Sequence, residues 1–329
     1  VNEHLLLVSF YRPTAKRYKI LIEENPFPSD MHAIISHIKS LSRTVVGEKS
    51  GGDIFDPEQA LIQIGPRPGE EFVRNEDVLQ LLEERGEEIA LVLLGGVHFM
   101  SGQSFDYEAI TKKGHEKGCI VGFDLAHGAG NIDLKLHDWN VDFACWCTYK
   151  YLNSGPGNVG ALFVHERHSE KSLDELPRFA GWWGHQRSTR FRLTNRFEPQ
   201  VGAASWQLSN PVVIGMVAVL AGLELFDEAT MPKLRAKSYL LTTYLEMLIE
   251  SELSQHVTIL TPRDPYQRGC QLSLRSNTKP LDEVMKKLRE KGVVCDEREP
   301  DIIRIAPTPL YNTFQDVYNC VMILKEIHQ

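Results

Sequence analysis

The feature of this sequence that most constrains its fold is a pair of short apolar runs that each end at a charged residue. Cys119–Asp124 ends in Asp124, and Asp142–Tyr149 is followed directly by Lys150. Neither run has helical periodicity, and glycine or polar residues bound both, as is typical of strands covered on both faces in a parallel sheet. Because the carboxyl ends of parallel strands share one edge, we expect Asp124 and Lys150 to lie in one crevice.

A lysine and an aspartate in one crevice favour pyridoxal phosphate (PLP) chemistry. The amine can form a Schiff base, and the carboxylate keeps the pyridine nitrogen protonated so that the ring accepts electrons. The turn-forming segment Asn153–Gly157 would let the backbone approach such a ligand. Simpler interpretations remain: Lys150 could face solvent, and Asp124 and His127 could be a helix cap and a core histidine.

Strand-like and helix-like segments alternate through the first two thirds of the chain. Strands are also predicted at Tyr18–Ile22, Glu88–Gly95 and Val159–Val164, and amphipathic helices at Asn75–Glu84 and Tyr107–Lys117. A further short helix is suggested at Asn2–Phe10. This alternation predicts an α/β fold, with a mostly parallel sheet flanked by helices on both faces.

A long loop and two long helices follow this alternation. The loop runs from Glu166 to Gln207, and loops of that length usually carry function or lack order. The helices are predicted at Asn210–Glu228 and Met231–Leu253. The first contains the apolar run Pro211–Phe226, which is too short for a membrane span and carries Glu224, so we expect a core helix.

The pattern after residue 230 indicates a second, smaller domain. Short strands are predicted at Val257–Leu260, Gly269–Leu274, Gly292–Cys295 and Ile302–Ile305, and helices at Leu281–Lys291 and Thr313–His328. We therefore expect a large α/β domain over 1–229 and a small α+β domain over 230–329.

Composition excludes several classes of partner. Hydrophobic residues make up 42% and charged residues 24%, the net charge is −8, and no cluster of Lys and Arg stands out, so we expect neither nucleic acid nor a membrane surface as partner. The six cysteines lie in apolar segments without metal-ligand spacing. We therefore expect no metal site and a reducing, cytoplasmic compartment.

Three further residues or pairs are weaker candidates. His98 follows a predicted strand and could open on the same crevice or be structural. Trp182 and Trp183 lie in the long loop, where they could cover a core edge, wall a pocket or reach across a dimer. Arg304 interrupts an apolar strand and needs a carboxylate partner, from the protein or from a substrate.

Segments spread over nearly the whole chain resemble the kynureninase family. That family belongs to the PLP-dependent transferases of the aspartate aminotransferase fold type (fold type I), and is class V aminotransferase-like, with a seven-stranded type of mostly parallel sheet. The segments that carry the resemblance are Pro26–Asp30, Gly96–Phe99, Val121–Asn131, Leu136–Asn153, Gly181–His185, Ser209–Pro211, Arg268–Ser273, Gly292–Pro300 and Arg304–Asn312.

The resemblance implies a role for each matching residue. Lys150 and Tyr149 would be catalytic, and Arg304, with Asn210, would bind substrate. Asp124 would pair with the pyridine nitrogen, and Trp182 and Asn210 would complete the pocket across a dimer interface. The residues implied in cofactor binding are Phe27, Asp30, Gly95, Asp124, His127, Tyr149, Lys150, Trp182 and Asn210.

The implied reaction is hydrolytic Cβ–Cγ cleavage of L-kynurenine or 3-hydroxykynurenine. Its products are anthranilate or 3-hydroxyanthranilate, together with L-alanine, and it belongs to tryptophan catabolism and NAD biosynthesis. The resemblance further implies a cytoplasmic homodimer with a small amino-acid substrate. The sequence does not distinguish between the two substrates.

Two departures from the family pattern leave alternatives open. Gly95 stands where the family commonly has a serine, so one hydroxyl contact to the cofactor phosphate is lost. The chain begins at Val1, so an N-terminal segment that carries the phosphate-binding turn is expected to be missing. The alternatives are a truncated, non-catalytic dimerising relative, or another class V PLP lyase such as a cysteine desulfurase.

Overall fold

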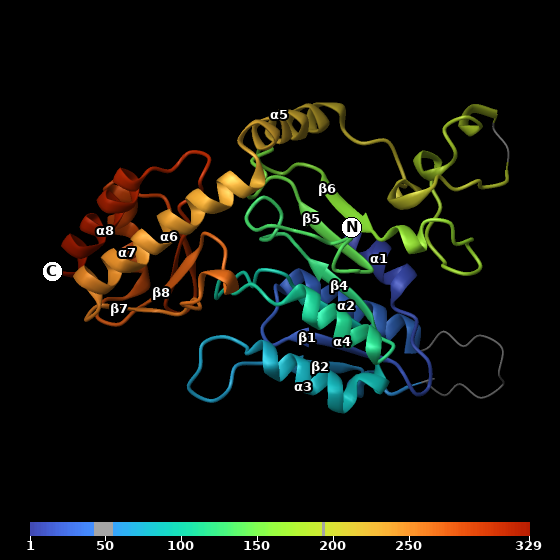
Figure 1. The fold of residues 1–329 in the computed structure, drawn as a ribbon, viewed down its shortest axis with the longest axis horizontal. Coiled ribbons are helices and arrows are strands. Elements are labelled where there is room, and N and C mark those ends of the chain that lie inside the picture. The colour runs from blue at the N-terminus through green and yellow to red at the C-terminus, as the bar shows by residue number, and fades with distance from the viewer. Residues whose placement is uncertain (43–54, 193–194) are drawn as a thin grey trace.

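The computed structural model describes residues 1–42, 55–192 and 195–329. It contains two sheets that lie side by side, a large one toward the right of Figure 1 and a small one toward the left. The large sheet has six strands in the order β2-β1-β3-β4-β5-β6, and the small sheet has four in the order β7-β8-β10-β9.

The large sheet is parallel except for its last strand. Strands β2, β1, β3, β4 and β5 run in one direction, and β6 pairs antiparallel with β5. The elements of this part are α1 (Asn2–Phe10), β1 (Lys19–Glu23), α2 (Pro28–Ser42), β2 (Leu61–Ile64), α3 (Asn75–Arg85), β3 (Ile89–Gly95), α4 (Tyr107–Glu116), β4 (Ile120–Asp124), β5 (Phe143–Cys147) and β6 (Gly160–Val164). The predicted α/β fold is confirmed, with six strands in the described residues where the family resemblance implied a seven-stranded type.

Helices cover both faces of this sheet because its central strands are apolar on both sides. Along β3, Val92 and Leu94 pack into the core beneath α3 and α4, whereas Leu91 and Leu93 pack into the core beneath α1 and α2. All four side chains are buried. The strands therefore lie inside the molecule, and only their ends reach solvent.

The small sheet is antiparallel and is covered by helices packed in one core with it. The elements of this part are α6 (Met231–Leu253), β7 (Val257–Ile259), β8 (Leu272–Ser276), α7 (Leu281–Glu290), β9 (Asp296–Arg298), β10 (Ile302–Ile305) and α8 (Phe314–His328), and α5 (Val213–Ala229) precedes them. The predicted strand at Gly292–Cys295 is wrong, since the strand begins at Asp296 and pairs with β10. The sequence patterns also did not indicate β2 or α2.

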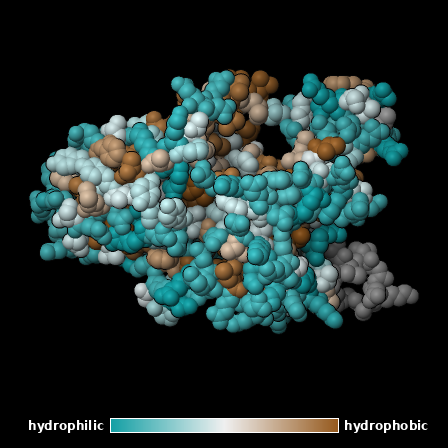
Figure 2. Space-filling model, in the orientation of Figure 1, coloured by the Kyte–Doolittle hydropathy of each residue, from teal (hydrophilic) through white to brown (hydrophobic). Residues whose placement is uncertain are grey.

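Helix α5 contradicts the expectation of a core helix. Within it only Gly222 and Phe226 are buried, while Ile214 is 84% exposed. The helix lies against the polar turn after β5, where a Cβ on Gly222 would stand 2.6 Å from the Leu152 carbonyl oxygen. Apolar residues consequently gather on the surface over α5, at the top of Figure 2. No helix in the described ranges is long and apolar enough to cross a membrane.

The predicted long loop holds short 3-10 turns between Glu166 and Trp206, and its residues 193–194 lie outside the described ranges. Its end is anchored by Trp206, which is buried beside α1 and donates from Nε1 to the Ser9 hydroxyl at 2.9 Å. The intervening segment extends away from the sheet in Figure 1. The loop therefore reaches outward from two fixed ends.

Asp142, just before β5, fixes the start of the strand that leads to Lys150. The nearly buried carboxylate lies 2.8 Å from a ring nitrogen of both His115 and His168, and also pairs with Arg167. Burial alone would raise the pKa of Asp142, but these donors hold it well below its usual range. Because a buried carboxylate is so costly unpaired, this cluster ties α4 and the loop after β6 to β5.

Candidate active site

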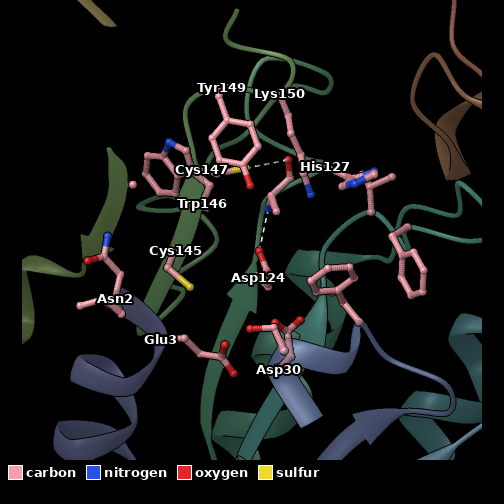
Figure 3. Close-up of a pocket in the computed structure, with 18 of the residues that line it drawn as sticks. Asn2, Glu3, Asp30, Asp124, His127, Cys145, Trp146, Cys147, Tyr149 and Lys150 are labelled. Carbon is pink, nitrogen blue, oxygen red and sulfur yellow. Dashed lines mark hydrogen bonds between the residues drawn. The ribbon is translucent and has the colours of Figure 1, made fainter. Parts of the chain in front are cut away.

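The carboxyl ends of β1, β3, β4 and β5 open on one cavity of about 370 Å³, shown in Figure 3. The N-terminal ends of α1 and α2 complete its wall. The lining residues are Val1, Asn2, Glu3, Glu23, Phe27, Ser29, Asp30, Gly95, Val97, Phe99, Asp124, Ala126, His127, Cys145, Trp146, Cys147, Tyr149, Lys150 and Gly160. The cavity therefore lies where open α/β sheets bind ligands.

Strand β5 ends at Cys147, two residues before the predicted end at Tyr149, so Lys150 lies in the turn that follows, three residues beyond the strand. Its ammonium stands 5.6 Å from the centre of the Phe27 ring. The turn closes with the Asn153 amide donating to the Lys150 carbonyl at 3.0 Å, and Asn153 takes a left-handed φ of 55°. Asparagine tolerates this conformation better than most residues, which explains its presence at position 153.

Asp124 is the last residue of β4 and points into the cavity. Its Oδ1 accepts from the Ala126 amide at 2.7 Å. Burial raises the pKa of Asp124, and the Ala126 amide, a hydrogen bond from Asp30 and the charge of Lys150 oppose that rise. Asp124 and Lys150 both line this cavity, as expected from their positions at the ends of two strands.

Two further carboxyl groups, Glu3 from α1 and Asp30 from α2, converge below Asp124 in Figure 3. Burial, followed by the charge of Asp124, raises the pKa of Asp30 to about 10. The same two causes raise the pKa of Glu3 to about 7. The hydrogen bond between Asp30 and Asp124 raises the pKa of Asp30 and lowers that of Asp124, so Asp30 is the one of the pair that holds the proton.

Gly95 ends β3 and faces a fourth carboxyl group. The Gly95 amide donates to Oε1 and Oε2 of Glu23, at 3.0 and 3.1 Å. A Cβ on Gly95 would stand 2.7 Å from Glu23 Oε1, too close without a shift. Glu23 thus occupies the space into which the side chain of a serine at this position would project.

The two histidines expected at the crevice, His127 and His98, are partly buried and neutral. Burial, followed by the charge of Lys150, lowers the pKa of His127 well below its usual value, and His127 Nδ1 has no hydrogen-bond partner in the described structure. Burial lowers the pKa of His98 to about 4, and His98 Nδ1 lies 3.1 Å from the Ser101 hydroxyl. His127 lines the cavity, whereas His98 does not and contacts Ser101 instead.

Arg304 comes from the small sheet and reaches the large one. Its Nη1 donates to the Phe99 carbonyl oxygen at 2.6 Å, and its Nη2 pairs with Asp296. Phe99 lines the cavity, with its ring centre 5.5 Å from that of Phe27. Arg304 therefore stands behind the cavity wall, paired inside the protein.

Trp182 and Asn210 are not brought into the cavity of this chain. Trp182 lies in the outward loop, is half exposed and donates from Nε1 to the Arg190 carbonyl at 3.3 Å. Asn210 is exposed just before α5. Tyr149, by contrast, lines the cavity beside Cys147, and that thiol and partial burial raise the pKa of Tyr149.

Several lining residues were missed from the sequence. Glu23 ends an otherwise apolar strand, so the rule that identified Asp124 could have identified it. Glu3 and Phe99 gave no such signal. Among the described residues, no group of three or more His, Cys, Asp or Glu side chains is arranged to hold a metal ion.

Comparison with known proteins shows close relatives. A family described as "Kynureninase C-terminal domain" matches residues 234–324. A protein named kynureninase from Koribacter versatilis (strain Ellin345) is 51% identical over 324 residues, which cover 98% of this chain and 72% of the relative. Those named kynureninase from Myxococcus xanthus (strain DK1622) and Mus musculus are 52% and 48% identical, over 99% of this chain and 73% and 69% of the relatives.

Solved structures share the fold at much lower identity. One described as "Apo structure of Cysteine Desulfurase from Thermococcus onnurineus NA1" has a TM-score of 0.77 at 14% identity, over 99% of this chain and 76% of that one. A C-DES mutant with glycine linked to its PLP cofactor has a TM-score of 0.76 at 17% identity, over 98% and 78%. The class V fold implied by the family resemblance is confirmed.

Glu23→Gln should stabilise the ligand-free protein at high pH. Burial, together with the charge of Asp124, raises the pKa of Glu23 from 4.5 to about 7. As the pH rises through this window, Glu23 ionises in the unfolded chain first, so the folded state loses stability relative to the unfolded chain. The loss is at most ~3 kcal/mol. In urea unfolding the variant should match the parent near pH 4.5 and exceed it at pH 8. Exposed Glu24→Gln is the control; identical pH profiles for Glu23→Gln and the parent would refute the assignment.

Proposed function

This chain belongs to the kynureninase family, and from that premise we propose that the cavity at the carboxyl ends of β1, β3, β4 and β5 is its active site. The protein is a PLP-dependent hydrolase that cleaves the Cβ–Cγ bond of kynurenine or its 3-hydroxy form, releasing an anthranilate and L-alanine. One observation carries the site assignment: Lys150, Asp124 and Phe27 face one cavity.

The cavity suits PLP in charge and in shape. Burial disfavours the anionic form of Asp124, and a cationic ring nitrogen beside it would stabilise that form. Phe27 is partly exposed and offers an aromatic face. The unpartnered Nδ1 of His127 leaves a polar atom free for a ligand, and buried polar atoms rarely lack a partner.

The residues of this chain would divide the work of holding the cofactor. Phe27 would stack on the ring, Asp124 would hold its nitrogen, and Asp30 and His127 would contact its hydroxyl or phosphate, near Gly95. By keeping its proton and donating a hydrogen bond, Asp30 favours the anionic form of Asp124. When bound, PLP withdraws electrons from the substrate carbon through its protonated ring.

Lys150 and Tyr149 are the proposed catalytic residues. The Lys150 amine would anchor the cofactor and then take the α proton of the substrate at Nζ. Because the pKa of Tyr149 is raised, its hydroxyl stays protonated at neutral pH and can donate a proton to the departing part of the substrate. Arg304 would bind the substrate α-carboxylate through its Nε–H, which has no acceptor in the described structure.

A homodimer would complete the site, with Trp182 and Asn210 reaching the partner's cavity. Support comes from α5, whose exposed Ile214, Val217 and Leu220 form an apolar surface next to Asn210. Apolar patches of this kind mark protein interfaces. A second copy of this chain is the occupant we propose, since the loop bearing Trp182 joins α5 directly.

Two organisational proposals remain. We propose that 1–229 and 230–329 are separate domains, because each holds its own sheet and core.

We also propose a cytoplasmic location, in line with six cysteines that are all free thiols.

The alternative of a cysteine desulfurase is not favoured. Such an enzyme needs a nucleophilic thiol on a mobile loop, whereas the cavity thiols, Cys145 and Cys147, lie on β5. Burial also raises the pKa of Cys145 well above its usual value, which opposes nucleophilic attack. The desulfurase structures are 14% and 15% identical, and that likeness shows the fold alone.

Asp124→Asn should impair turnover far more than substrate binding. The amide keeps the shape but cannot hold a proton on the ring nitrogen, so we expect kcat to fall by at least ~100-fold, about 3 kcal/mol of barrier, with little change in KM. Anthranilate release measures this, with exposed Asp133→Asn as the control. An unchanged kcat would show that Asp124 only accepts a hydrogen bond from the Ala126 amide in the turn after β4 and does not act on the cofactor.

Ile214→Glu combined with Val217→Glu should weaken the proposed dimer. Burying two carboxylates in an apolar interface is costly, so we expect the dimer dissociation constant to rise by at least ~10-fold. Analytical ultracentrifugation over a range of concentrations measures it, with Tyr266→Glu, also on the surface, as the control. A parent protein that sediments as a monomer throughout would contradict the proposal.

A further inference from the structure

The contacts of Arg304 single out Asp296, a residue without a role so far. The two are direct cross-strand partners, Arg304 on β10 and Asp296 on β9, in an antiparallel pair. Their side chains therefore project from the same face of the sheet. Asp296 Oδ2 accepts from Arg304 Nη2, and Oδ1 accepts from Arg298 Nη1 and from the Glu297 amide, both at 2.9 Å.

The other end of the Arg304 guanidinium is held by the large sheet. Nη1 donates at 2.6 Å to the carbonyl oxygen of Phe99, in the loop after β3 that lines the cavity. The Phe99 carbonyl and the Asp296 carboxylate, which accept from Nη1 and Nη2, together fix the plane of the guanidinium. The Nε–H remains buried and without an acceptor in the described structure.

Burial makes this arrangement depend on Asp296. The Arg304 side chain is only 8% exposed, and an isolated buried cation is strongly disfavoured. Asp296 is 49% exposed, so its carboxylate keeps much of its hydration while compensating that charge. Without it, Arg304 would keep the Phe99 carbonyl as its hydrogen-bond acceptor in the described structure and could turn about its side-chain bonds.

We propose that Asp296 is a positioning residue for the substrate carboxylate: it holds the Arg304 guanidinium against Phe99, leaving the unpartnered Nε–H to a ligand carboxylate. The inference rests on the proposed role of Arg304 as the carboxylate-binding residue. Asp296 itself touches neither substrate nor cofactor. It acts through Arg304 alone, because cross-strand register keeps the two side chains together.

The test compares two ligands that differ only in the carboxylate. L-Alanine and L-alaninamide are titrated into the PLP-loaded protein, and binding is followed by the cofactor absorbance and by calorimetry. Asp296→Ala should weaken L-alanine by about tenfold, the worth of one charge-assisted hydrogen bond, and leave L-alaninamide within about twofold. Asp296→Asn keeps an acceptor for Nη2 and should fall between the parent and Asp296→Ala.

The control is Asp301→Ala, which removes a carboxylate paired with Arg275 in the same small sheet. It should change neither ligand. Equal loss of both ligands in Asp296→Ala, or tighter L-alanine, would overturn the proposal, since tighter binding would make Asp296 a competitor of the substrate. If Asp296→Ala fails to fold, Asp296→Asn decides: parental affinity for L-alanine overturns the proposal.

Arg304→Lys separates this inference from the proposed function. If Arg304→Lys leaves the preference for L-alanine over L-alaninamide intact, Arg304 does not bind the carboxylate and the role proposed for it fails. If Arg304→Lys abolishes the preference while Asp296→Ala preserves it, Arg304 keeps its role and only the positioning by Asp296 is refuted.

Discussion

A parallel arrangement of strands brings the ends of β1, β3, β4 and β5 to one edge of the large sheet. Glu23, Gly95 and Asp124 each end one of these strands, and Lys150 follows the fourth. Glu23 and Lys150, which are 127 positions apart in the sequence, thereby share one cavity. The wall is rigid because apolar cores on both faces of the sheet hold the strands in place.

That convergence creates an electrostatic problem, which the site resolves by sharing protons. Glu3, Glu23, Asp30 and Asp124 surround a small space, and burial raises the pKa of each. Asp30 stays protonated and donates a hydrogen bond to Asp124, which favours a negative charge on Asp124, where a ring nitrogen would bind. The small sheet contributes the opposite charge through Arg304, whose own countercharge is Asp296.

Patterns in the sequence indicated the strands that carry Asp124 and Lys150, because a buried parallel strand must be apolar and a charge at its end is conspicuous. They did not reveal Glu3, since a carboxylate at the start of a helix is ordinary there. The core position expected for α5 failed for a different reason: apolar residues show that burial of a helix would be favourable, but not that its own chain buries it. Arg304 was expected to need a carboxylate, and the register of β9 and β10 supplies Asp296.

The central claim is that Lys150 is the residue that holds the cofactor, opposite Asp124 in this cavity. Borohydride reduction of the PLP-loaded protein, followed by digestion and mass spectrometry of the peptides, tests it directly. We expect one pyridoxyl group per chain, on the peptide that contains Lys150. A pyridoxyl group on any other lysine, or a Lys150→Ala variant that is labelled as fully as the parent, would contradict it.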